Sequence, residues 1–255
     1  MTDNSDTSDP SDIEEAVTVS DSVGVSIREY YSFSHIRSAS LNVLQAAKIE
    51  EKYEETGQCS MEQEMNYLSH ISTSLINSAA FIESCANEFF SDLNKDIIVD
   101  SKYNLDEEFL RSIQATHEGA KRQFTHNTPP LQKYQWMLSL SQHEKFDRGK
   151  PPYQDMNDLM SLRNYLIHYE PEDIVLSHPK REVDTSHIFI DKLENKGIKP
   201  APFKNENDTN RYLSYECGKW AVDSSLEFTD QFFSKFGTKA PYDHIRSDIQ
   251  SNLEL

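Results

Sequence analysis

The chain has 255 residues, with 43 acidic and 25 basic side chains, a formal net charge of −18 and 36% hydrophobic residues. This length allows a sizeable core, and the low apolar content predicts that part of the chain stays unburied. The charge argues against a broad coating of nucleic acid, because phosphate contacts need local lysine and arginine.

The N-terminal segment is polar and acidic, and helical periodicity follows it. Residues 1–25 are predicted to form a disordered acidic tail, since the first 21 carry seven acids and no base. Apolar residues then recur at helical spacing over 34–55 and, most clearly, over 65–89, where the stripe extends for about seven turns. Gly57 separates the two segments, which predicts an antiparallel helix pair.

Three shorter helices are predicted next. One follows Asn104, one begins after Pro129–Pro130, and one follows Pro151–Pro152. Pro171 ends the last of them, because proline lacks an N–H group and disfavours a helical conformation at the residue before it. With the first pair, these segments predict a helical bundle over residues 30–170.

The last third of the chain is less regular. Residues 171–204 contain four prolines and the β-like run His187–Ile190, which predicts an irregular insertion with one strand. A long C-terminal helix is predicted over 205–238, with Asp208 as its N-cap and Gly237 at its C-terminal end.

Residues 239–255 are predicted to be a loose C-terminal tail. The resulting fold class is all-α, an antiparallel helical bundle with an irregular insertion and a long C-terminal helix that packs on the bundle.

Several function classes lack support in the sequence. It contains no apolar run of about 18 residues, and its N-terminus has no basic segment followed by an apolar one. Three scattered cysteines do not form a disulfide framework, which favours a reducing compartment. The glycine-rich, HExxH, CxxC and GxSxG motifs of phosphate, zinc and hydrolase sites are missing. We therefore expect a cytoplasmic protein without a membrane partner.

One constellation of residues suggests chemistry, and it lies near the end of the fifth predicted helix. Arg163 and Asn164 precede His168 by five and four residues. Asn164 and His168 share a helix face, so the amide can orient the imidazole, and the long Arg163 side chain can reach a phosphate near the histidine. A histidine in the last helical turn, beside an arginine, suits phosphodiester cleavage, because the imidazole moves a proton and the guanidinium stabilises phosphate charge. The alternative is a helix C-terminus stabilised by a cation and a surface amide.

The stretch LRNYLIHYEPE (162–172) resembles the RN-x-x-x-H motif of the HEPN superfamily, and SAAFIESCANEFF (78–90) resembles an earlier helix of bacterial and archaeal members. The resemblance covers roughly residues 30–170. It implies an α-helical bundle that dimerises. Many members are metal-independent endoribonucleases of the toxin or antiviral-defence type, in which the ribose 2′-OH attacks the adjacent phosphorus. The insertion and the C-terminal helix depart from a minimal domain of this family.

Carried onto this chain, the resemblance implies that Arg163 binds and polarises the phosphate and that Asn164 orients His168, the general acid/base. Glu83 is a further catalytic candidate, with a carboxylate paired to an arginine as the alternative. RNA is the implied substrate, a homodimer the implied assembly, and an antitoxin or a nucleotidyltransferase a candidate partner, with no metal or cofactor. Two other functions stay open: a non-catalytic HEPN-like module that binds a partner protein or a nucleotide, and a metal-dependent hydrolase.

The charge is unevenly distributed, which leaves room for a local RNA site. Residues 1–110 have a net charge of −16, whereas residues 111–150 have a net charge of +4. Over 121–150, cations alternate with aromatic residues, a composition typical of single-stranded RNA binding. The residues expected to bind RNA are Lys121, Arg122 and Lys133. The alternative is a helix with Trp136 in the core and ordinary surface lysines.

Overall fold

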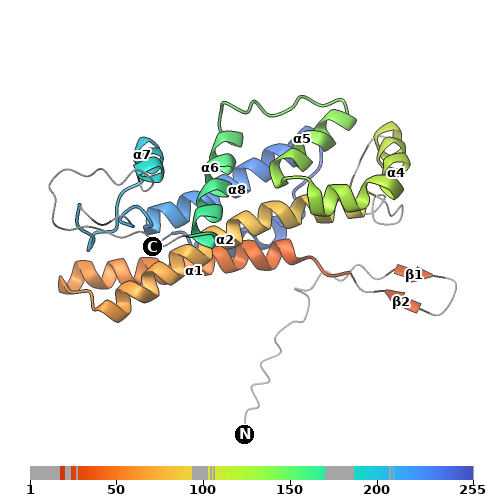
Figure 1. The fold of residues 1–255 in the computed structure, drawn as a ribbon. Helices are drawn as coiled ribbons and strands as arrows, with labels where there is room; N and C mark the ends of the chain where they lie inside the picture. The colour runs from red at the N-terminus through yellow and green to blue at the C-terminus, as the bar shows by residue number, and fades with distance from the viewer. Residues whose placement is uncertain are drawn as a thin grey trace, which may run out of the picture.

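The structure is a computed structural model that describes residues 18–20, 24–26, 28–93, 103, 105, 107–169, 187–206, 208 and 210–254. The regular secondary structure of these residues is helical apart from one short antiparallel pair of strands, β1 (Thr18–Ser20) and β2 (Gly24–Ser26) (Figure 1). The all-α class is therefore confirmed. β1 and the first two residues of β2 lie within the segment 1–25, for which no strand was predicted, and the rest of that segment lies outside the described residues.

The two longest helices form an antiparallel hairpin, as predicted. α1 (Tyr31–Thr56) ends at Gly57, whose φ of 65° is the left-handed conformation that glycine adopts without steric cost. α2 (Met61–Asp92) begins with a capping box, in which Ser60 and Gln63 each accept a backbone N–H of the other.

α2 lies at the centre of the bundle and contacts α1, α5, α6 and α8 (Figure 1). Its apolar stripe is buried from the middle of the helix onward, whereas Met65 near its start is exposed. The buried members of the stripe are Ile71, Leu75, Ala79, Ile82, Ala86 and Phe89. In the described part of the chain, no helix has the length and apolar character that a membrane span requires.

The three shorter helices of the bundle are also present. α4 (Glu107–Arg122) continues into a π-helical turn, η1 (Gln123–Asn127), and α5 (Pro130–Leu140) follows. α5 has a proline in its first turn, where the missing N–H costs no helical hydrogen bond. α6 (Tyr153–Ile167) packs against both α2 and α8.

The strand predicted at residues 187–190 is wrong, because these residues begin a helix, α7 (His187–Asn195). A run of four apolar or β-favouring residues fits either structure, and here Leu193 continues the apolar side of the run and is buried. Lys192 of α7 pairs with Asp158 of α6 at 3.1 Å. The insertion is therefore partly helical and is attached to α6. Residues 170–186 lie outside the described part.

The C-terminal helix starts later than predicted. α8 (Tyr215–Lys235) has Ser214 as its N-cap, and the Ser214 hydroxyl accepts the N–H of Cys217. Asp208 instead accepts a backbone N–H within an upstream turn. Gly237, with a φ of 66°, follows the end of the helix as expected.

The prediction of a loose tail over 239–255 is wrong for the described residues of that range. A 3-10 turn, η2 (Asp243–Ile245), leads into a short helix, α9 (Arg246–Ser251). α9 packs against α1, and Tyr242, Ile249 and Leu253 are buried. These apolar side chains join the hydrophobic core, which is why the segment is ordered.

Candidate functional site

The residues Arg163, Asn164 and His168 lie in the last turn and at the end of α6. One side of this helix buries Met156, Leu159 and Leu162. Asn164 and His168 are exposed and Arg163 is half-buried. The helix thus fixes the motif through its apolar side and presents the polar side chains outward.

Arg163 and Asn164 line a pocket of about 300 Å³ together with Glu83 of α2. The start of α5, from its N-cap residue Pro129 to Gln132, forms another part of the wall of this pocket. Arg163 Nη1 donates to Asn164 Oδ1 at 2.9 Å, so the Asn164 amide contacts the guanidinium and not the imidazole. The structure thus brings Glu83 and two of the three motif residues into one pocket.

His168 is the C-cap residue of α6, and its backbone N–H donates to the Asn164 carbonyl oxygen at 2.9 Å. Its exposed imidazole makes no hydrogen bond or ring contact with the residues that the structure describes. The apolar neighbours Ile167 and Tyr169 are 46% and 55% exposed. His168 is therefore accessible beside an apolar surface, one turn beyond the Asn164 side of the pocket.

Lys133 is not placed to bind RNA, which corrects the sequence prediction. Its side chain is fully buried, and its ammonium donates to Glu83 Oε1 at 3.1 Å, Asn87 Oδ1 at 2.9 Å and the Thr125 carbonyl at 3.1 Å. An ammonium has three N–H donors, so none is left for a phosphate. Lys133 instead pairs with Glu83, for which the sequence suggested an arginine partner.

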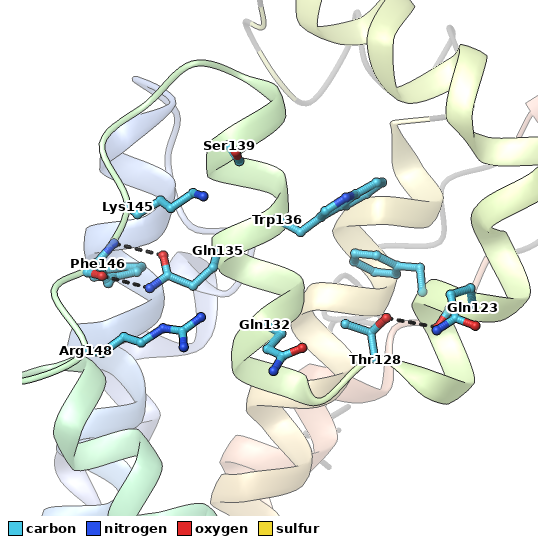
Figure 2. Close-up of a pocket in the computed structure, with 10 residues that line it drawn as sticks. Gln123, Thr128, Gln132, Gln135, Trp136, Ser139, Lys145, Phe146 and Arg148 are labelled. Atoms are coloured by element: carbon cyan, nitrogen blue, oxygen red, sulfur yellow. Dashed lines mark hydrogen bonds between the residues drawn. The ribbon is translucent and has the colours of Figure 1, made fainter.

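The other two residues expected to bind RNA, Lys121 and Arg122, have side chains outside the described part of the structure. Lys145 and Arg148, which are not among the three residues predicted to bind RNA, are exposed and line a hollow of about 560 Å³ with Trp136 (Figure 2). All three belong to the stretch whose alternation of cations and aromatic residues suggested RNA binding. Among the cations of this stretch whose side chains the structure describes, Lys145, Arg148 and Lys150 are exposed and Lys133 is buried.

The cysteines and acidic clusters offer little further chemistry. Burial raises the pKa of Cys217 to about 12, so its thiol stays protonated and a poor nucleophile at neutral pH. Over the described ranges, no group of three or more His, Cys, Asp or Glu side chains is arranged to hold a metal ion.

Comparisons with protein-family models, with curated proteins and with solved structures found no match. The resemblance to the HEPN superfamily therefore rests on the residues of α6 and α2.

Proposed function

We propose that the chain is a metal-independent endoribonuclease of HEPN type, acting as a toxin or in antiviral defence. The observation that carries the proposal is the common pocket of Arg163, Asn164 and Glu83, one helical turn before an accessible histidine. Lys133 balances the charge of Glu83, and Arg163 adds a further positive charge. The pocket therefore suits a phosphate although the whole chain is acidic.

The proposed reaction uses the RNA's own 2′-hydroxyl as nucleophile. His168 accepts the proton of this hydroxyl while its oxygen bonds to the adjacent phosphorus, and the guanidinium of Arg163 stabilises the charge on the phosphate oxygens. The P–O5′ bond breaks, and the departing 5′-oxygen takes up a proton from the imidazolium. The products are a 2′,3′-cyclic phosphate and a 5′-hydroxyl, and no bound water or metal is consumed.

We further propose that the exposed end of α6 is completed by a second copy of the chain. The HEPN resemblance implies a homodimer in which the motif helices meet. The exposure of Ile167 and Tyr169 on either side of His168 supports this arrangement, because large apolar side chains next to a functional group are typical of an interface. Such a dimer would exclude water around the imidazole.

The test is cleavage of single-stranded RNA in the presence of EDTA. Replacing the general acid/base in His168→Ala should lower the rate by about 10²- to 10⁴-fold. Arg163→Ala should also lose most activity, and Arg163→Lys should restore part of it. Matched controls are His126→Ala and Arg111→Ala, which alter exposed side chains outside the pocket and should leave the rate unchanged.

The outcomes separate the three functions. Cleavage in EDTA that depends on His168 and leaves a cyclic phosphate supports the proposal. Activity that disappears with EDTA supports a metal-dependent hydrolase. If the unmodified chain does not cut RNA, and its expression slows growth no more than His168→Ala does, the enzyme proposal is wrong and a non-catalytic binding module is favoured.

A further inference from the structure

The outer face of α5 carries a hollow of about 560 Å³, a size typical of pockets that bind small organic groups (Figure 2). Lys145 and Arg148 come from the loop after α5 and lie on one side of the helix, and Trp136 points to the other. Polar residues of α5 lie between them. These are Gln132, Gln135 and Ser139. The hollow therefore has a cationic end and an aromatic end.

The aromatic end is held in place by the core. Trp136 is half-buried, and its ring lies 5.3 Å from that of Phe124 and 5.8 Å from that of Phe90, centroid to centroid. Phe90 and Phe124 are themselves stacked at 3.9 Å. Because these rings support Trp136 from within, its accessible surface is a ready platform for a planar ring.

The cationic end is also fixed in position, because the loop that carries it packs against the bundle and is hydrogen-bonded to it. Phe146, between the two cations, is buried and stacks on Phe228 at 4.6 Å. Its backbone N–H and C=O both bond to the Gln135 amide, at 3.0 and 2.8 Å. Lys145 and Arg148 thus extend from a fixed segment.

The only acidic residue between these cations is engaged elsewhere. Asp147 accepts the N–H of Gly149 at 2.9 Å and pairs with Lys150 at 3.5 Å. Among the described residues, neither Lys145 nor Arg148 forms an ion pair with a carboxylate. Their charges are available for an anionic ligand.

We propose that this hollow binds a nucleotide of single-stranded RNA that flanks the cleaved bond, with the base stacked on Trp136 and phosphates held by Lys145 and Arg148. Gln132 lines both this hollow and the pocket of Arg163. One RNA strand can therefore extend from the hollow to the pocket across the start of α5. The assignment of the strand to a substrate rests on the proposed endoribonuclease function. A duplex does not fit, because its bases are paired and stacked internally and cannot reach the indole.

The first experiment follows the fluorescence of Trp136 directly. The sequence has two tryptophans, and Trp220→Phe leaves Trp136 as the only one. A His168→Ala background prevents the proposed cleavage during the titration. An oligoriboadenylate of about eight nucleotides, a length suited to a short single-strand site, should quench the emission in a saturable way. The same sequence in a duplex, and adenosine monophosphate alone, should quench it far less.

The second experiment removes the cations. Lys145→Ala/Arg148→Ala should weaken oligoriboadenylate binding by about ten-fold and lower the slope of affinity against salt by about 1.4, because two phosphate contacts are lost. The matched control, Lys48→Ala/Lys52→Ala, removes the same charge from exposed positions outside the hollow and should leave both quantities unchanged.

The results distinguish this proposal from the proposed function. If the chain cuts RNA but the emission of Trp136 is not quenched, or if the two double variants bind oligoriboadenylate with the same affinity, the proposal for the hollow is overturned and the endoribonuclease proposal stands. Equal quenching by adenosine monophosphate or by the duplex also overturns the proposal for the hollow. If the oligonucleotide quenches Trp136 and the Lys145→Ala/Arg148→Ala variant binds it more weakly, but no RNA is cut, the hollow is a single-strand binding site and the endoribonuclease proposal fails.

Discussion

At the scale of single residues, Lys133 is the side chain whose role differs most from the one that its surroundings in the sequence suggest. It lies on α5 and binds Glu83 and Asn87 of α2 and a carbonyl of η1. A buried ammonium is tolerated only when its charge is paired and its donors are used. Lys133 therefore joins three elements and fixes the Glu83 wall of the proposed active site.

Replacing this lysine should destabilise the protein. Lys133→Met keeps much of the side-chain volume, but it leaves a carboxylate, an amide oxygen and a carbonyl without their donor. We expect a loss of about 2–4 kcal/mol in the free energy of unfolding, toward the lower end because Glu83 is partly exposed to solvent. Urea denaturation measures this loss. Lys145→Met, at an exposed position, is the control and should change stability by less than about 0.5 kcal/mol.

The same contacts explain what the sequence could not predict about the site. The spacing of Arg163 and Asn164 is local, and the resemblance of α2 to an earlier HEPN helix pointed to Glu83. The pairing of Lys133 with Glu83 spans 50 residues and depends on how α5 packs on α2. A lysine flanked by aromatic and polar residues has the same sequence pattern whether it is buried or exposed.

At the scale of elements, the N-terminus of α1 is capped by another helix. The side chain of its N-cap residue, Tyr30, does not cap the helix, and its hydroxyl donates to Asp92 of α2 instead. Glu88 of α2 accepts the Ser32 N–H at 2.9 Å and also the Ser32 hydroxyl. A carboxylate at this position satisfies a free backbone donor and interacts favourably with the helix dipole.

This cap should make stability depend on pH. Burial raises the pKa of Glu88 above its ordinary value of 4.5, and this effect exceeds the lowering by the Ser32 hydrogen bonds. The folded state therefore binds this proton more tightly than the unfolded state does. The resulting stabilisation is present below about pH 4.5 and is lost as the pH rises through the folded pKa.

Glu88→Gln removes this titration and keeps an acceptor for Ser32. Relative to this variant, the unmodified chain should lose unfolding free energy as the pH rises from 4.5 to neutrality, which urea denaturation across that range measures. Glu62→Gln, at an exposed position in the first turn of α2, should follow the unmodified chain. Parallel stability curves for the unmodified chain and Glu88→Gln would contradict the assignment.

How well each element can be predicted depends on the number of residues over which its apolar pattern repeats. The apolar stripe over 65–89 repeats over many turns and correctly predicts the central helix, α2. The run His187–Ile190 is too short to distinguish helical from strand periodicity, so a strand is predicted where the structure has α7. Asp208 and Ser214 are both good caps, and Ser214 begins α8 because the upstream segment is held in a turn by Lys204, which pairs with Asp208 and Glu64.

At the scale of the whole molecule, the C-terminal segment completes the core. Tyr242 is fully buried, with its ring 5.1 Å from that of Phe81 on α2. Its hydroxyl donates to Asp230 of α8 at 2.7 Å, and Arg246 binds the same carboxylate at 2.7 Å. The segment therefore links α2 and α8, the two helices that also hold α6 and its motif.

Removal of this segment should lower the stability of the whole bundle. Deleting 239–255 exposes the apolar surfaces that Tyr242, Ile249 and Leu253 cover, so the urea midpoint should fall sharply. Tyr242→Ala should cost about 3–5 kcal/mol through the cavity that it leaves, and Tyr242→Phe about 1 kcal/mol through the lost hydrogen bond. This graded series separates ring packing from the hydroxyl. A truncated chain that unfolds at the same urea concentration as the full chain would show that the tail is loose, as its sequence suggested.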